Sequence, residues 1–256
     1  MSDGRITRHP ILSIPKRKKV GFYWNNTRLQ AYDGEVISSA LFANGIRVFG
    51  HHAKDSSAQG IFCANGQCAQ CMVIANGIPV KSCMTRVEEN MIVESAEGLP
   101  RLPEATEEFE FASIEQINTD GLIIGGGPAG LSAALELGER GIDTLIVDDK
   151  GRLGGKLVLQ THKFFGSIED CYAGTRGIDI AKLLEDNIRT LPSVKAWLNS
   201  TAMYVFSDKK VGIVTHNTHY RIVNPKVVLN AAGAREKSLI FPGNTLPGVY
   251  GAGAFQ

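Results

Sequence analysis

The sequence predicts two domains of different class, an α+β domain over residues 1–93 and an α/β domain over residues 119–256, joined by an acidic linker over residues 94–118. Three observations predict this division. The expected elements change from strands around one helix to alternating strands and helices. A glycine-rich turn opens the first helix of the second domain. The net charge also changes along the chain. Residues 1–93 carry 11 basic and 6 acidic side chains (+5), residues 94–118 carry 1 basic and 7 acidic (−6), and residues 119–256 carry 15 basic and 13 acidic (+2).

The first domain is rich in expected strands. Two of them, over 18–24 and 27–32, flank the turn pair Asn25-Asn26, which is typical of a hairpin. Residues 36–45 show apolar side chains at helical spacing and end in Asn-Gly, which stops a helix. Further short strands are expected over 72–75, 78–81 and 91–93. Two strands, a helix and then more strands are the order of a β-grasp topology.

The second domain begins with a strand, a helix and a strand. An apolar strand is expected over 121–124, a helix over 129–140 and a second strand over 144–147, a unit of the size of a parallel crossover. A helix over 178–191 stops before Pro192. Strands are then expected over 194–198, 202–206, 211–216, 219–223 and 227–230. This order predicts a Rossmann-type α/β domain.

Composition excludes several classes of protein. The 256 residues carry a net charge of +1 with 43% hydrophobic residues, which argues against a dedicated nucleic-acid binder. No apolar run approaches the roughly 18 residues of a membrane span, and the N-terminus has no apolar signal region. Four of the five cysteines fall within residues 63–83, which favours a metal site in a reducing compartment over a disulfide framework. We therefore expect a cytoplasmic protein.

The clustered cysteines have the spacing of an iron–sulfur site. Cys63, Cys68, Cys71 and Cys83 form the pattern C-x4-C-x2-C-x11-C. Soft thiolates suit iron–sulfur chemistry, and C-x4-C-x2-C followed by a distant cysteine is the plant-type [2Fe–2S] arrangement. The intervening residues are small or uncharged, so backbone N–H groups can approach the sulfurs. A structural zinc site is the alternative, although the four-residue gap fits it less well.

The glycine-rich turn has the context of a dinucleotide fingerprint. Gly125, Gly127 and Gly130 satisfy G-x-G-x-x-G between an expected strand and an expected helix. Gly125 would permit the tight turn, Gly127 the approach to a diphosphate, and Gly130 close packing of helix on strand. The diphosphate would lie at the helix N-terminus, where Pro128 and Ala129 begin the first turn. Asp148, at the end of the next strand, would accept from the ribose hydroxyls. The fingerprint alone leaves FAD and NAD open.

The motifs together resemble a known group of flavoproteins. The run Gly60-Ile-Phe-Cys-Ala-Asn-Gly-Gln-Cys-Ala-Gln-Cys-Met-Val resembles the plant-type ferredoxin loop, and its short gap to Cys83 is similar to the [2Fe–2S] domains attached to amine and amino-acid oxidoreductases. These include hydrogen cyanide synthase and sarcosine-oxidase-like α subunits. Residues 119–256 resemble the FAD half of two-dinucleotide-domain flavoproteins of the pyridine nucleotide-disulfide oxidoreductase type. That resemblance implies FAD, with Gly154 and Gly155 along its diphosphate and Gly233 near the flavin.

The resemblance implies an iron–sulfur flavoprotein subunit. FAD and the cluster would exchange electrons during oxidation of an amine, imino acid or amino acid such as sarcosine, proline, hydroxyproline or an opine. A separate flavoprotein subunit, with other oxidoreductase subunits, would be its partner, and no nucleic acid or membrane partner is expected. An NAD(P)H-dependent flavin reductase and a non-catalytic electron-transfer module are the alternatives. No residue arrangement identifies a catalytic group.

Two further expectations concern single features. Cys171 is outside the cluster and is expected to be a structural thiol, and His162 to pack or to approach the flavin. In flavoproteins of the type that this chain resembles, the FAD domain is interrupted by an NAD-type domain and then resumes. No second G-x-G-x-x-G follows Gly130. The sequence therefore predicts that the FAD-binding domain is truncated or is completed by a partner.

Overall fold

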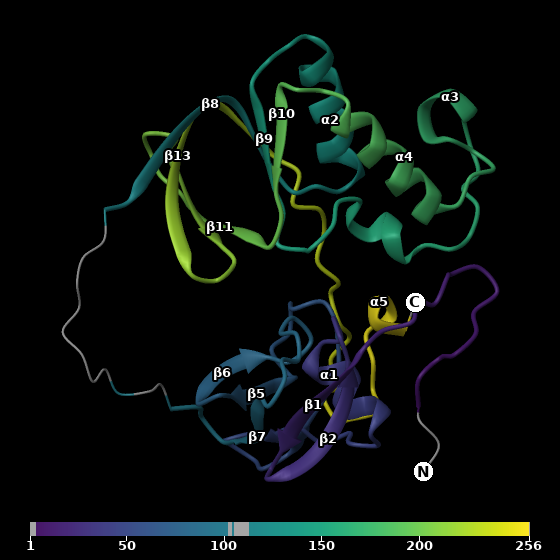
Figure 1. Cartoon of the computed structure of the whole chain (residues 1–256), viewed down its shortest axis with the longest axis vertical. Coiled ribbons are helices and arrows are strands. Elements are labelled where there is room, and N and C mark those ends of the chain that lie inside the picture. The colour runs from purple at the N-terminus through teal and green to yellow at the C-terminus, as the bar shows by residue number, and fades with distance from the viewer. Residues whose placement is uncertain (1–3, 102–103, 105–112, 256) are drawn as a thin grey trace. The chain divides into compact units, whose positions relative to one another are not determined.

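The computed structural model describes residues 4–101, 104 and 113–255, and it divides the chain into two units (Figure 1). Unit 1 contains Met1–Glu108 together with Arg235–Gln256, and unit 2 contains Phe109–Ala234. The predicted linker lies partly outside the described residues. The division of the sequence at residues 93 and 119 stays a prediction, but the structure adds that residues 235–256 group with unit 1.

Unit 1 is built on a mixed sheet in the order β2-β1-β7-β3-β4. β1 pairs with β2 as an antiparallel hairpin and with β7 in parallel, and β5 joins β7 to β6 through antiparallel pairs. The elements are β1 (Lys19–Trp24), β2 (Thr27–Tyr32), α1 (Ile37–Ala43), β3 (Gly50–His51), β4 (Ala58–Gln59), β5 (Met72–Ala75), β6 (Ile78–Lys81) and β7 (Ile92–Glu97). A parallel central pair with hairpins around one helix is the expected β-grasp order.

Alternation along the strands makes the core of unit 1. Along β1, Val20, Phe22 and Trp24 point to the buried side, as the period of two requires. They form one cluster with Ile37 and Leu41 of α1. The turn between β1 and β2 has positive φ at Asn25 (43°) and Asn26 (66°), the conformation that the Asn-Asn pair predicts for a tight hairpin.

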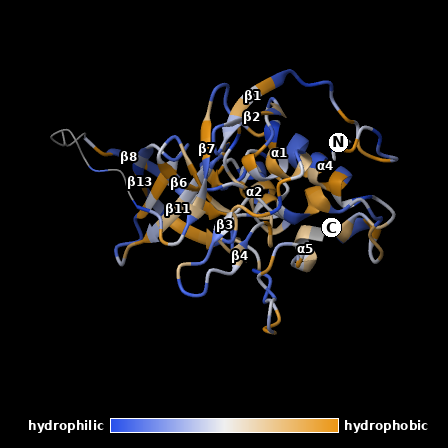
Figure 2. Ribbon diagram, turned by 90° about the horizontal axis from the view of Figure 1, so that it is seen from below, coloured by the Kyte–Doolittle hydropathy of each residue, from blue (hydrophilic) through white to orange (hydrophobic). Residues whose placement is uncertain are grey.

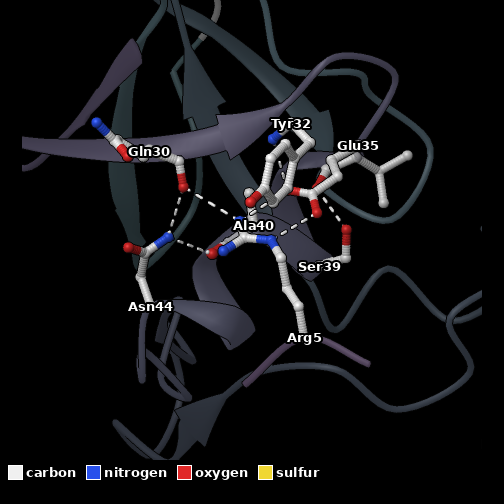
Figure 3. Close-up of polar contacts among 8 residues, drawn as sticks. Arg5, Gln30, Tyr32, Glu35, Ser39, Ala40 and Asn44 are labelled. Atoms are coloured by element: carbon white, nitrogen blue, oxygen red, sulfur yellow. Dashed lines mark hydrogen bonds and ion pairs between the residues drawn. The ribbon is translucent and has the colours of Figure 1, made fainter. Parts of the chain in front are cut away.

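The N-terminal arm is fixed to unit 1 by Arg5 (Figure 3). Its Nε and Nη2 donate to the two carboxylate oxygens of Glu35 at 2.7 and 2.8 Å, and Nη2 also donates to the carbonyl of Gln30. The guanidinium lies 5.0 Å from the ring centroid of Tyr32. Burial opposes ionisation of Glu35, but the Arg5 hydrogen bonds and the N–H of Tyr32 outweigh it and lower the pKa of this carboxyl.

Unit 2 is built on a six-stranded sheet in the order β10-β9-β8-β13-β12-β11. The strands from β10 to β13 along this order are parallel, and β12 and β11 continue the sheet as antiparallel strands. The strands are β8 (Glu115–Ile124), β9 (Thr144–Val147), β10 (Val194–Trp197), β11 (Ser200–Val205), β12 (Val211–Thr215) and β13 (His219–Asn230).

The helices of unit 2 connect its parallel strands. α2 (Pro128–Glu139) joins β8 to β9, and α4 (Gly177–Arg189) precedes β10. Hydrophobic and hydrophilic residues are mixed along α4 (Figure 2). Its Ile180, Leu184 and Ile188 are buried in one cluster with residues of α2 and the sheet. The shorter helices are η1 (Gly155–Leu159), α3 (Ile168–Cys171) and, in unit 1, α5 (Ala252–Phe255). No helix in the described part of the chain is long and apolar enough to cross a membrane.

The prediction of two strands over 219–223 and 227–230 was wrong, because β13 runs unbroken through Asn224-Pro225. Pairing with β12 ends at Val223, whereas pairing with β8 continues to Asn230. Pro225 therefore lies where one side of the strand is open, so its missing N–H removes no ladder bond there. Because β13 pairs with β8 from Arg221 onward, β8 begins at Glu115, earlier than predicted. In unit 1, β7 also extends beyond the predicted strand and ends at Glu97.

Candidate cluster and dinucleotide sites

The loop between β4 and β5 brings the first three cysteines together. Positive φ angles at Ala64 (51°), Gly66 (82°) and Ala69 (59°) coil it tightly between those strands. A Cβ on Gly66 would lie 2.9 Å from the Cγ of Met84, so a larger residue would collide there. Cys83 lies two residues after the end of β6. Cys63, Cys71 and Cys83 are buried and Cys68 is half-buried.

The four thiols influence one another as two pairs. The Cys68 thiol is among the groups that lower the pKa of Cys63, and the Cys83 thiol is the largest of the groups that lower the pKa of Cys71. Among the described residues, no three His, Cys, Asp or Glu side chains gather around one point that could hold a metal ion. Four cysteine thiolates are the ligand set of a plant-type [2Fe–2S] cluster.

The backbone of the cluster loop favours anionic sulfur. Burial opposes ionisation of Cys63, but the N–H groups of Asn65, Gln67 and Cys68 and the Cys68 thiol outweigh it and lower its pKa. The Cys83 thiol, ahead of backbone N–H groups, lowers the pKa of Cys71 to about 6, while the pKa of Cys83 is raised in return. Burial raises the pKa of Cys68, so one thiol of each pair ionises more readily than the other. Thiolates are the species that bind iron.

The glycine-rich turn has the geometry that its motif predicts. Gly125 has φ +109°, and a Cβ there would lie 2.3 Å from the carbonyl oxygen of Ala231. A Cβ on Gly130 would lie 1.9 Å from the carbonyl oxygen of Gly125. Gly127 differs, because its Cβ would meet only the Cα of Gly155, at 3.9 Å. Gly125 and Gly130 therefore serve packing, and Gly127 lies beside open space that a diphosphate can use.

The second glycine pair lies against the first turn of α2. The N–H of Gly154 donates to the carbonyl of Gly126 (2.8 Å), and a Cβ on Gly155 would lie 2.8 Å from the Cα of Gly127. Pro128 has no N–H, and the N–H groups of Ala129 and Gly130 have no acceptor within the helix, as at any helix start. This cradle of backbone without side chains fits a diphosphate.

Asp148 is buried beneath the turn. One carboxylate oxygen accepts from the N–H of Gly126 (2.7 Å) and the other from the N–H of Lys150 (2.8 Å). Burial raises its pKa although both N–H groups oppose that shift. Asp148 thus fixes the glycine turn directly, a role that the motif did not predict. Each oxygen keeps a second lone pair, so acceptance from a ribose stays a prediction.

The remaining predicted residues lie apart from these two arrangements. Gly233 follows β13 with φ +75°, and a Cβ there would meet nothing within 4 Å. His162 stacks on Phe164 with ring centroids 5.3 Å apart. The thiol of Cys171 donates to the carbonyl of Ser167 (3.0 Å) in unit 2, outside the cluster loop.

Sequence reasoning missed two cations at the cluster loop. Lys81 donates to the carbonyl of Gly66 and Arg235 to the carbonyl of Gln67. Lys81 lies in the x11 gap of the cysteine motif, where the motif specifies no residue type, and Arg235 lies 168 residues beyond Gln67 in the chain. No spacing in the sequence indicates such contacts.

Comparison with known families agrees with this geometry. Residues 17–98 match the family described as 2Fe-2S iron-sulfur cluster binding domain. Residues 119–254, more than half of the chain, match the family Pyridine nucleotide-disulphide oxidoreductase. The chain belongs to this family. The predicted fold class is therefore confirmed, and so is an oxidoreductase with a [2Fe–2S] cluster and FAD as cofactors.

Individual relatives of this oxidoreductase carry subunit names. It is 34% identical over 151 residues to Sarcosine oxidase subunit alpha of Rhizobium meliloti, covering 54% of this chain and 14% of that protein. It is 32% identical over 136 residues to Hydrogen cyanide synthase subunit HcnB of Pseudomonas protegens, covering 53% and 29%. The predicted resemblance is confirmed.

A solved structure resembles both units of this oxidoreductase. L-proline dehydrogenase from P. horikoshii matches 92% of this chain and 45% of that one, with a TM-score of 0.73 and 27% identity. The chain thus spans less than half the length of each of these three proteins.

Proposed function

We propose that this oxidoreductase is an iron–sulfur flavoprotein subunit that transfers electrons between FAD and a [2Fe–2S] cluster during oxidation of an amine, imino acid or amino acid. The observation that carries the proposal is the pairing of a four-thiol loop with a bare backbone cradle at a helix N-terminus in one chain. When bound, FAD supplies two-electron chemistry and the cluster supplies one-electron chemistry. Together they would convert a two-electron oxidation into single-electron transfers.

In this proposal the two cofactors are held by different kinds of group. Cys63, Cys68, Cys71 and Cys83 would hold the irons of the [2Fe–2S] cluster through their sulfurs. The first-turn N–H groups of α2 bind the FAD diphosphate beside Gly127, with Gly154 and Gly155 closing the cradle. Asp148 holds the turn and accepts from the ribose. Gly233 lies near the flavin.

Substrate class and partners come from the relatives. Their names include sarcosine oxidase, hydrogen cyanide synthase and proline dehydrogenase, and sarcosine and proline are secondary amines. We therefore propose a secondary amine or amino acid as the electron source, and a second flavoprotein subunit as the partner that oxidises it. The clustered thiols fit a reducing compartment, so we place the protein in the cytoplasm.

The test uses the chain purified anaerobically with any subunit that copurifies. We expect about two irons and two sulfides per chain, one FAD, and a [2Fe–2S] EPR signal on reduction. Proline or sarcosine should bleach the flavin band and then produce the cluster signal. N-acetylproline, which lacks the basic amine, is the matched control and should do neither. Bleaching by NADH or NADPH without response to any amine would instead support a flavin reductase and contradict the proposal.

A further inference from the structure

The backbone between Cys63 and Cys68 is held from outside by two cations. The Nζ of Lys81, the last residue of β6, donates to the carbonyl oxygen of Gly66 at 2.7 Å. The guanidinium of Arg235 donates to the carbonyl oxygen of Gln67. Both belong to unit 1, and both side chains are exposed.

The same two peptide groups contact a cysteine on their other side. The N–H of Gln67 shares a peptide group with the carbonyl of Gly66, and the N–H of Cys68 shares one with the carbonyl of Gln67. Both N–H groups are among the groups that lower the pKa of the Cys63 thiol, so both act on its sulfur. Two consecutive peptide groups therefore each connect a cation to the same sulfur.

This arrangement affects the charge that the sulfur can carry. A cation at a carbonyl oxygen polarises the peptide group and strengthens its N–H as a donor, because hydrogen bonds in a chain reinforce one another. Stronger N–H donors, like positive charge nearby, stabilise the added negative charge of a reduced iron–sulfur cluster. The cations thus favour the reduced state through the peptide groups.

We propose that Lys81 and Arg235 are positioning residues that raise the reduction potential of the cluster. The inference rests on the proposed cluster site and adds to it the part of the chain that sets the potential. Arg235 follows by two residues the glycine assigned to the flavin, so one stretch of sequence serves both cofactors. The contact between Arg235 and the loop lies within unit 1.

The segment over 235–256 keeps Arg235 at the loop. The N–H of Gly251 donates to the carbonyl of Phe62, the residue before Cys63, at 3.1 Å. The carboxylate of Glu236 accepts from the N–H groups of Ala252 (2.7 Å) and Gly253 (3.3 Å), which closes the segment on itself. The segment 235–256 therefore contacts the cluster region twice, through Arg235 near its beginning and through Gly251 near its end.

The test is an EPR-monitored redox titration of the full chain with dithionite, at low and high salt. Arg235→Ala and Lys81→Ala should each lower the equilibrium constant for one-electron reduction about twofold to fivefold, the size of an exposed charge interaction. A tenfold change is about 59 mV for a one-electron couple. The difference should shrink at high salt, since exposed charges are screened. Arg235→Lys keeps the charge and should restore most of the potential.

Lys237→Ala is the matched control, because Lys237 lies in the same segment and donates no hydrogen bond to the loop among the described residues. Its potential should equal that of the wild type. Unchanged potentials in both test variants, or an equal shift in Lys237→Ala, would overturn the proposal. Loss of iron from both variants would also overturn it, since the cations would then serve assembly of the loop. A wild-type chain without a [2Fe–2S] signal would overturn the cluster site itself, which separates that failure from this one.

Discussion

The cluster loop and the glycine turn hold their cofactors by opposite means. In the proposed cluster site four cysteine side chains are the ligands, and the backbone supports them with N–H groups. In the proposed dinucleotide site the backbone is itself the ligand, and side chains are absent at Gly125 and Gly130 because a Cβ there would occupy the space of another backbone group. The cluster site depends on the sulfur atoms of cysteines, whereas the dinucleotide site depends on glycines, which have no side chain.

This difference predicts different responses to mutation. Removing the sulfur of Cys68, which is half-buried and lies outside the core cluster of unit 1, removes a proposed metal ligand with little loss of packing. Adding a methyl group at the turn changes no ligand, but it places carbon inside the van der Waals radius of a carbonyl oxygen. The cluster should therefore be lost from a folded domain, whereas the dinucleotide should be lost together with the fold of its domain.

The largest effect is expected for Gly130→Ala. Its Cβ would lie 1.9 Å from the carbonyl oxygen of Gly125, which is backbone and cannot rotate away, so α2 must move off β8. We expect a loss of several kcal/mol in the stability of unit 2, above the usual 1–3 kcal/mol of overpacking. FAD should be absent, and the cluster in unit 1 should remain. Flavin content, iron content and thermal unfolding by circular dichroism measure this.

Gly127→Ala is its control, because this Cβ would meet only a Cα at 3.9 Å. Unit 2 should keep its unfolding midpoint while FAD binds less tightly. Equal thermal stability of Gly130→Ala and wild type would show that the turn is looser than its geometry indicates. Unchanged FAD affinity in Gly127→Ala would place the diphosphate elsewhere.

The second effect concerns the cluster alone. Cys68→Ser should lose the [2Fe–2S] EPR signal, because a hydroxyl is a poor replacement for a soft thiolate on iron. FAD should remain, since its cradle lies in unit 2. Cys171→Ser, which changes a thiol outside the cluster loop, should keep both cofactors. Stoichiometric zinc without iron in the wild-type chain would contradict the assignment of all four ligands.

Sequence reasoning succeeded where chemistry depends on local spacing. Three of the four ligands lie within nine residues, and the glycine turn, its strand and its helix are consecutive, so both motifs are visible in a short window. The strand pairs of the hairpin 19–32 and of β5 and β6 were predicted for the same reason. Turn residues and alternation are local signals.

Sequence reasoning failed where contacts join distant parts of the chain. Nothing in the spacing indicates that Arg235 contacts Gln67, or that residues 235–256 group with unit 1. Asn224-Pro225 predicted a break because local propensity takes no account of where the neighbouring strand ends. The double role of Asp148 was hidden because its partner, the N–H of Gly126, lies 22 residues away in a turn that had been assigned only to the cofactor.

The smallest predicted effect tests a contact that neither motif contains. Arg5→Ala should lower the free energy of unfolding of unit 1 by about 1–3 kcal/mol, because it removes charge-assisted hydrogen bonds from a carboxylate whose side chain is only 13% exposed. Arg5→Lys should recover part of this, since lysine keeps the charge but not the paired geometry. Lys182→Ala, which breaks an exposed pair with Asp186, should cost about 0.5 kcal/mol or less.

The lowered pKa of Glu35 determines how the effect of Arg5→Ala on the free energy of unfolding changes with pH. Glu35 has a lowered pKa in the folded chain, so its contribution is present above the unfolded pKa and is lost as the pH falls through the folded one. The difference between wild type and Arg5→Ala should therefore be constant near neutrality and shrink below about pH 4. Urea unfolding followed by Trp24 fluorescence in a Trp197→Phe background reports unit 1 alone, because these are the two tryptophans of the chain. A difference that stays constant on acidification would mean that the Arg5 contact stabilises unit 1 through packing on Tyr32 rather than through the charge of Glu35.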